Sequence, residues 1–442
     1  MFRALRNALI VVAAALCGVA TATATATSVA QPPATSAQPS SPLGGVNIFG
    51  LGFGSRPAEA DREIALAQRM HAKVVRIDLP WAVLQPHGPN EFDAQAQAFT
   101  DRVVADAAAA GIGVIMTARA TPCWDSSAPA DVLSHCSTTR LTDANAWPPR
   151  NLAAYGAFVA YLAQRYGTRL AGIEIWNEPD QINELYFAGR EKAKRYAAVL
   201  RAAYPAIKQA NPNVRVLAGS LVGSNGIFLR ALYKAGIKGY YDALAVHFYT
   251  LTLASLRAFR QVQLENGDSK PLWLDEFGWS SCWPRHRIEQ EQACVTARVQ
   301  ATNIANVFRS LARSTYVGAE LTYQLMDVRN EEFGAVTASG APKPAFAALS
   351  SVLASPFGAV SPVTLSLKRR GGRVLASGGG PVGDVMGLEA FNGRVLRYRA
   401  EFTLDRFNRY SITLPRALGS SGLRIRVFQL WSALGGTAQK SI

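Results

Sequence analysis

Several common signatures are absent from this chain of 442 residues. No Gly-x-Gly-x-x-Gly turn follows the first apolar run and no P-loop occurs, so nothing favours a nucleotide-binding fold. No Cys-x-x-Cys or His-x-x-His spacing occurs, which argues against a zinc site. Glycine and proline are not enriched and 49% of residues are hydrophobic, so the chain is not globally disordered and can form a sizeable core.

The N-terminal residues 1–30 resemble a signal peptide. Arg3 and Arg6 precede an apolar stretch over 8–20, and Ser28-Val29-Ala30 has the small-x-small form of a cleavage site. An uncleaved membrane anchor is the alternative, but the apolar stretch is short for a span. Residues 31–44, rich in Pro, Ser, Ala and Thr, predict a flexible linker. The chain is therefore expected to be exported to the periplasm, the cell envelope or the medium.

Export changes the interpretation of the cysteines. Outside the signal segment, which contains Cys17, four remain: Cys123, Cys136, Cys282 and Cys294. An even number in an oxidising compartment predicts disulfides, and the local pairing Cys123–Cys136 with Cys282–Cys294 closes the shortest loops. Free buried thiols are the alternative.

Residues 45–355 alternate short apolar runs with long amphipathic stretches. The runs are 46–53, 73–79, 113–118, 172–177, 214–219, 243–248, 271–277 and 319–325, and the helical patterns include 58–70, 93–110, 152–166, 193–210 and 289–311. Eight strands with intervening helices predict an α/β fold, a (β/α)8 TIM barrel, over a doubly wound sheet. Residues 356–442 contain short alternating segments and an Asn392-Gly393 turn, which predict a small antiparallel β-sandwich.

Polar residues gather where the predicted strands end, which is where barrel enzymes place their chemistry. Two glutamates stand out, because Glu178 follows the apolar run of 171–176 and Glu276 follows that of 271–274. Two carboxyl groups on rigid strand ends are what acid-assisted cleavage of a glycosidic bond needs. The other candidates are Arg76, Trp124, Asn177, His247, Tyr249, Trp279, Tyr323 and Gln324.

Three motifs carry a resemblance to a known group of enzymes. Ile-Trp-Asn-Glu-Pro at 175–179, His-x-Tyr at 247–249 and Asp-Glu-Phe-Gly-Trp at 275–279 resemble clan A of the retaining glycoside hydrolases, with family 39 closest. The resemblance implies that Glu178 is the general acid/base and Glu276 the nucleophile. It also implies no metal or organic cofactor. Many members have a tryptophan at the end of the eighth strand, where this chain has Tyr323 and Gln324.

Physical roles follow for the neighbouring residues. A guanidinium beside a carboxylate favours its charged form, so Arg76 is expected to keep Glu276 ionised, although it could instead pair with Asp78. Tyr249 would donate a second hydrogen bond to Glu276, and Asn177 would hold the 2-hydroxyl of the sugar. Trp124, Trp279 and Tyr323 could stack on sugar faces or belong to the core, and His247 could be a core histidine.

The sequence therefore predicts a retaining glycoside hydrolase acting on β-linked poly- or oligosaccharide. A transglycosylase with the same catalytic pair and a non-catalytic carbohydrate-binding barrel are the alternatives. The formal net charge is +15, and residues 361–442 hold thirteen Lys and Arg against four Asp and Glu. Such an excess attracts polyanions. An acidic polysaccharide or an anionic envelope is a better partner for an exported protein than nucleic acid.

Overall fold

The structure is a computed structural model that describes residues 41–223, 225–249, 253–285, 293–328, 331–382, 385–418, 422–430 and 436–442. The predicted signal peptide, Cys17 and most of the predicted linker lie outside the described residues. Within the described part, no helix is long and apolar enough to cross a membrane.

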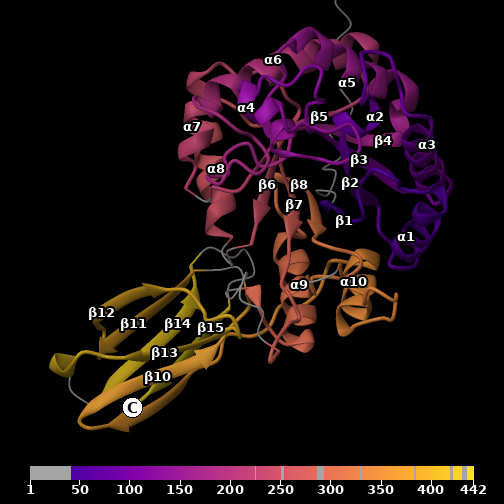
Figure 1. The fold of residues 1–442 in the computed structure, drawn as a ribbon. Helices are drawn as coiled ribbons and strands as arrows, with labels where there is room; N and C mark the ends of the chain where they lie inside the picture. The colour runs from indigo at the N-terminus through magenta and orange to yellow at the C-terminus, as the bar shows by residue number, and fades with distance from the viewer. Residues whose placement is uncertain are drawn as a thin grey trace, which may run out of the picture. The chain divides into compact units, whose positions relative to one another are not determined.

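Eight parallel strands close into a barrel in sequence order, which confirms the predicted fold (Figure 1). The strands are β1 (Leu43–Asn47), β2 (Val74–Pro80), β3 (Gly113–Arg119), β4 (Leu170–Ile175), β5 (Val216–Leu221), β6 (Ala243–Phe248), β7 (Leu272–Phe277) and β8 (Val317–Thr322). The helices are α1 (Pro57–Arg69), α2 (Trp81–Leu84), α3 (Ala94–Ala109), α4 (Ala130–Leu133), α5 (Leu152–Tyr166), α6 (Lys192–Ala210), α7 (Ile227–Lys234), α8 (Ala254–Glu265), α9 (Ala297–Leu311) and α10 (Pro344–Ala354). Short 3-10 turns are η1 (Asp143–Ala146) and η2 (Gly167–Arg169).

Two elements differ most from their predicted bounds. The helix expected over 289–311 begins at Ala297, because the Thr296 hydroxyl accepts from the backbone N–H of Val299 and caps the helix there. The first strand spans Leu43–Asn47 instead of the predicted 46–53, so it begins inside the predicted linker.

The loop after β1 nevertheless continues along β2. The backbone N–H groups of Ile48 and Leu51 donate to the carbonyls of Arg76 and Asp78. Gly50 permits this approach, since an added Cβ atom there would lie 2.5 Å from the Cβ of Asp78. The loop therefore packs closely against the rim of the barrel beside Asp78.

The inside of the barrel changes from apolar to polar along its axis. One apolar cluster draws on six strands and on no helix, so it fills the barrel interior: Val74, Ile115, Leu217, Ala243, Ala245, Trp273, Ala319 and Leu321. Because side chains alternate along a strand, residues two positions further on also face inward. These positions include Arg76, Thr117, His247 and Asp275. The carboxyl ends of the strands thus surround a buried polar layer.

The C-terminal residues form the predicted antiparallel sandwich. One sheet has the order β13 (Arg409–Thr413), β10 (Arg373–Gly379), β9 (Ser366–Arg370). The other has the order β12 (Val395–Phe402), β11 (Met386–Asn392), β14 (Leu423–Gln429), β15 (Thr437–Ser441), with the turn η4 (Arg416–Leu418) preceding β14. Asn392 pairs with Val395, which confirms the hairpin at Asn392-Gly393. β15 was not predicted, because its sequence Thr-Ala-Gln-Lys-Ser has little apolar character.

Candidate active site

Glu178 is held by a tight turn directly after β4. Trp176 and Glu178 both have positive φ angles, 74° and 44°. Residues other than glycine adopt such angles only when the surrounding structure imposes them. The Trp176 ring is fully buried against Phe187, and its indole N–H donates to the Tyr186 carbonyl at 2.6 Å. Trp176 therefore anchors the turn from below and presents Glu178 at the barrel mouth.

Glu276 at the end of β7 accepts from both residues that the sequence assigned to it. Nη1 of Arg76 lies 2.6 Å from Oε1, and the Tyr249 hydroxyl donates to Oε2 at 2.8 Å. Nδ1 of His247 lies 3.3 Å from the same Oε2. Burial raises the pKa of Glu276 above its ordinary value, while His247, Arg76 and Tyr249 each favour the carboxylate.

Glu178 lies next to Glu276 in a different environment. One oxygen of each carboxyl group lies within 4.8 Å of the other. Glu178 Oε1 is 2.6 Å from Nδ1 of His247, and its second oxygen accepts from the Gln181 amide. Burial raises the pKa of Glu178 to about 7. Burial also lowers the pKa of His247 to about 4, so the imidazole is neutral at neutral pH.

Arg76 is the centre of the buried polar layer. Its guanidinium donates to Glu174 at 2.8 Å, to Asn47 at 3.1 Å, to Asn177 at 2.7 Å and to Ser220 at 3.3 Å, besides Glu276. It does not pair with Asp78, the alternative partner considered above. The contact with Asn177 occupies the amide oxygen, so its NH₂ group stays available for a sugar hydroxyl.

Two buried acids beneath the catalytic pair were not among the predicted site residues. Glu174 lies on β4, where it also accepts from Thr117 at 2.5 Å. Asp275, on β7, has both oxygens without a hydrogen-bond partner among the described residues, 3.5 Å from Nε of Arg76 and 3.6 Å from Nε2 of His247. Burial and the charge of Glu174 raise the pKa of Asp275 far above its ordinary value. Alternation along β4 and β7 was the only available signal that these acids face inward.

The aromatic candidates occupy different positions. Tyr323 contacts Tyr249 edge-to-face with ring centres 6.0 Å apart, and its hydroxyl donates to Glu331 at 3.0 Å. Trp124 is partly exposed and packs edge-on against Trp81. Trp279, in contrast, is 1% exposed and belongs to the core, so little of its ring is open to a ligand. The Gln324 amide nitrogen is buried without a hydrogen-bond partner among the described residues.

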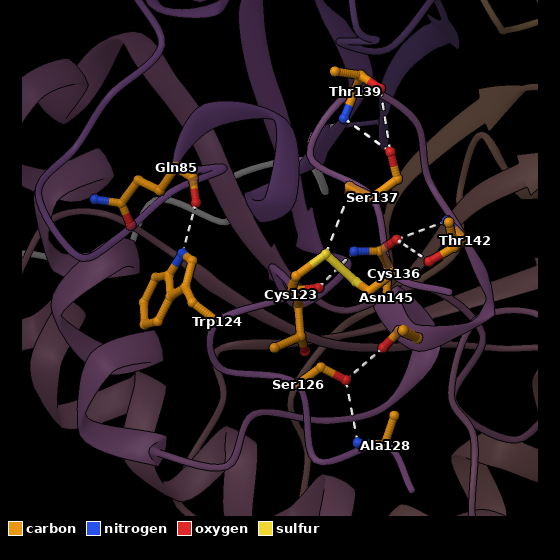
Figure 2. Close-up of a disulfide and its surroundings, with 12 residues drawn as sticks. Gln85, Cys123, Trp124, Ser126, Ala128, Cys136, Ser137, Thr139, Thr142 and Asn145 are labelled. Carbon is orange, nitrogen blue, oxygen red and sulfur yellow. Dashed lines mark hydrogen bonds between the residues drawn. A yellow bond between two sulfur atoms is a disulfide. The ribbon is translucent and has the colours of Figure 1, made fainter. Parts of the chain in front are cut away.

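Both predicted disulfides are present. Cys123 is bonded to Cys136, and Cys282 to Cys294. Figure 2 shows the first bridge beside Trp124, whose indole N–H donates to the Gln85 carbonyl at 2.9 Å. The bridge thus closes the loop that carries Trp124.

Two groups of side chains could geometrically hold a metal ion. They are Glu174, His247 and Asp275, and Glu178, His247 and Glu276, each with ligand atoms within 4.8 Å of one another. Both groups include His247, whose Nδ1 atom already contacts both catalytic candidates. The expectation of a metal-free site stays a prediction.

Comparisons with known proteins agree with this site. Residues 163–340, which include Glu178, His247 and Glu276, match the model of the glycosyl hydrolase catalytic core. No curated protein sequence matches the chain.

Solved structures share the fold. A family 39 glycoside hydrolase from the gut symbiont Bacteroides cellulosilyticus WH2 is 15% identical with a TM-score of 0.55, over 85% of this chain and 79% of that chain. A glucosidase from Croceicoccus marinus is 12% identical with a TM-score of 0.53, over 79% and 88%. An endo-beta-1,4-mannanase from Thermotoga petrophila is 14% identical with a TM-score of 0.51, over 90% and 97%.

Together the model match and the fold confirm the predicted resemblance to the clan A glycoside hydrolases. They support a glycosidase built on a (β/α)8 barrel.

Proposed function

We propose that this protein is an exported retaining glycoside hydrolase that cleaves β-linked poly- or oligosaccharides by double displacement. The proposal rests mainly on the two neighbouring carboxyl groups of Glu178 and Glu276. Burial raises the pKa of both, but Glu276 accepts hydrogen bonds from Arg76 and Tyr249, which favour its anion. Retaining enzymes hold their carboxyl groups about 5–5.5 Å apart, whereas inverting enzymes separate them by about 6.5–9.5 Å to admit a water molecule. One oxygen of Glu178 lies within 4.8 Å of one oxygen of Glu276, and this proximity supports the retaining arrangement.

In the first step, Glu276 attacks the anomeric carbon while Glu178 protonates the departing oxygen. Arg76 and Tyr249 hold the Glu276 oxygens and favour its anion. A pKa of about 7 keeps Glu178 substantially protonated at neutral pH. The bond from the sugar to the leaving oxygen breaks as the glycosyl-enzyme ester forms.

In the second step, Glu178 removes a proton from water, which attacks the ester and releases Glu276. Forming the ester neutralises Glu276, and the loss of a neighbouring negative charge favours the ionised form of Glu178. Neutral His247 can accept a hydrogen bond from protonated Glu178 or, in its other tautomer, donate one to the carboxylate. The same side chain therefore stabilises both states of the acid/base.

The decisive experiment is the stereochemistry of the first product. Purified protein should be screened against aryl β-glycosides and cell-wall or exopolysaccharide polymers, and the reaction on the best substrate followed by proton NMR. Double displacement gives the β-anomer first. An α-anomer as first product would refute retention, and a Glu178→Gln/Glu276→Gln variant controls for contaminating hydrolases. Export is tested separately, by N-terminal sequencing of protein from the extracellular fraction.

A further inference from the structure

An ion pair that the catalytic steps do not use lies at the rim of the barrel. Arg119 is the last residue of β3, and Asp78 lies near the end of the neighbouring β2. Nε of Arg119 donates to Oδ1 of Asp78 at 2.5 Å, and Nη2 donates to Oδ2. The bidentate contact holds both side chains in a fixed orientation.

The pair lies next to the catalytic carboxyl groups. The charge of Arg119 acts on Glu178, where it lowers the pKa against the larger opposing effect of burial. The Tyr186 ring centre lies 5.2 Å from the Arg119 guanidinium carbon, and the charges of Glu178 and Glu276 both help to raise the pKa of Tyr186, after burial. The backbone N–H of Trp176 donates to the Ala118 carbonyl, and its indole N–H to that of Tyr186, so Asp78, Arg119 and Tyr186 lie around the space beside the turn that carries Glu178.

These side chains have polar atoms that could still form hydrogen bonds with a ligand. Arg119 and Asp78 remain 17% and 34% exposed. Two of the five guanidinium N–H groups reach Asp78, and each carboxylate oxygen can accept a further hydrogen bond. The Tyr186 hydroxyl makes no hydrogen bond to any described residue.

The charges around this space do not favour an anionic sugar. Two guanidinium groups, those of Arg76 and Arg119, face three carboxylates, those of Glu174, Glu276 and Asp78. A uronate would bring another negative charge next to this set. Hydroxyl groups, which both donate and accept, suit the free atoms of a neutral ion pair better.

The strand order gives the site its position relative to the sugar. In a closed ring of eight strands, β3 lies opposite β7, which carries Glu276. A sugar whose anomeric carbon faces Glu276 therefore directs its remote side toward β2 and β3. On the basis of the proposed function, we propose that Asp78, Arg119 and Tyr186 recognise the glycone, binding two neighbouring hydroxyls of an uncharged sugar remote from the anomeric carbon.

The test measures coupling between the pair and these hydroxyls. Asp78→Asn and Arg119→Gln should each lower kcat/KM on the best aryl β-glycoside by roughly 10- to 100-fold, the effect of one or two charged hydrogen bonds. A deoxy analogue lacking one remote hydroxyl should lose a similar factor with the wild type and little with Asp78→Asn. Asp101→Asn is the matched control, because Asp101 forms a bidentate pair with Arg165 on the outer helices α3 and α5.

A third variant protects the test against misfolding. Tyr186→Phe removes only a hydroxyl and leaves the ion pair intact, and it should also lower kcat/KM. Equal losses with the deoxy analogue in wild type and Asp78→Asn would overturn the proposal, as would preference for a glucuronide over the neutral sugar.

Calorimetric binding of the same sugars separates this proposal from the proposed function. A protein that binds sugars through Asp78 and cleaves none would refute the hydrolase and support the recognition site. A hydrolase indifferent to Asp78→Asn would refute the site alone. Absence of both sugar binding and cleavage would overturn both.

Discussion

His247 Nδ1 lies 2.6 Å from Glu178 Oε1 in a buried contact. Because burial lowers the pKa of His247 to about 4, this contact joins a neutral imidazole to the proposed acid/base. A charged imidazole there would favour ionised Glu178 and weaken it as an acid. The burial of His247 therefore helps to keep the proton on Glu178. It also means that titration of His247 does not contribute to the pH dependence of catalysis near neutral pH.

The two glutamates should respond differently to truncation. Glu276→Ala removes the nucleophile and should abolish turnover of every substrate. Glu178→Ala should spare the first step for substrates with good leaving groups, which need no protonation, and added azide should accelerate the second step and yield a β-glycosyl azide. Steady-state kinetics with dinitrophenyl and unactivated glycosides would check this. Equal losses in both variants without azide rescue, in folded protein, would contradict the assigned roles.

Activity should fall as the pH rises through about 7. Glu178 must be protonated in the first step, and its pKa in the free protein is about 7. Because the protonated form disappears as the pH rises through this value, kcat/KM should fall across that range. The measurement is a pH profile of kcat/KM on an unactivated substrate. In Glu178→Gln, assayed with a dinitrophenyl glycoside, the alkaline limb should disappear. Its persistence would assign the titration to another group.

The disulfide Cys123–Cys136 should stabilise the fold measurably. The two cysteines are 13 residues apart, and closing a loop of about 15 residues contributes on the order of 3 kcal/mol in the chain-entropy model. A Cys123→Ser/Cys136→Ser variant should lose about that much free energy of unfolding in urea, and reductant should destabilise the wild type similarly. Peptide mapping of non-reduced protein gives an independent check, because crossed pairs or free thiols would exclude this bridge.

Glu320 on β8 should destabilise the protein at neutral pH. It is 1% exposed, its Oε2 atom has no hydrogen-bond partner among the described residues, and burial raises its pKa far above the ordinary 4.5. The folded state keeps the proton that the unfolded state releases. The free energy of unfolding therefore falls as pH rises above about 4.5, by up to about 1.4 kcal/mol per unit until the folded state also ionises.

Glu320→Leu should remove this effect. We expect it to raise the free energy of unfolding at pH 7 by about 1–3 kcal/mol, and by less at pH 4.5. Glu320→Gln, which cannot ionise but keeps a polar group, is the control and should remove only the pH dependence. Urea unfolding at both pH values measures this. A gain from Glu320→Leu that is equal at the two values would contradict the assigned titration.

The basic C-terminal sandwich should retain acidic polymers. Thirteen Lys and Arg against four acids leave an excess of nine positive charges over 361–442. Fields of this kind are screened over about 8 Å at physiological salt, so retention should weaken as salt rises. Pull-down on acidic and neutral polysaccharides, with full-length protein and protein lacking 361–442, tests this. Retention unaffected by the deletion or by salt would leave the sandwich a purely structural role.

The hydrogen bonds of the catalytic glutamate Glu276 could be predicted from the sequence, whereas the contacts and burial of the residues around the site could not. The contacts of Glu276 with Arg76 and Tyr249 followed from motifs at the ends of β2, β6 and β7. The pairing of Asp78 with Arg119 did not, because contacts between neighbouring strands depend on a register that each strand's own sequence does not reveal. Trp279 is an aromatic residue directly after a catalytic strand, as expected of a side chain that stacks on a sugar. Only the three-dimensional packing shows that its ring is buried.

Acids inside the barrel were equally hard to predict. Glu174 and Asp275 sit within apolar runs, where an isolated carboxylate would be costly. Glu174 is accommodated because Arg76, from a distant segment, donates to it, and Asp275 because burial and the charge of Glu174 favour its neutral form. Such compensation between strands is visible only after the barrel has closed.

The many contacts of the Arg76 guanidinium limit which parts of this protein could change without loss of the fold. From β2 it contacts side chains of β1, β4, β5 and β7, so one group both organises the charges of the reaction and ties five of the eight strands together. Altering the chemistry would therefore disturb the closure of the barrel. New substrates would be accommodated most readily at the rim, among residues such as Tyr186 and Arg119, while the layer beneath stays as it is.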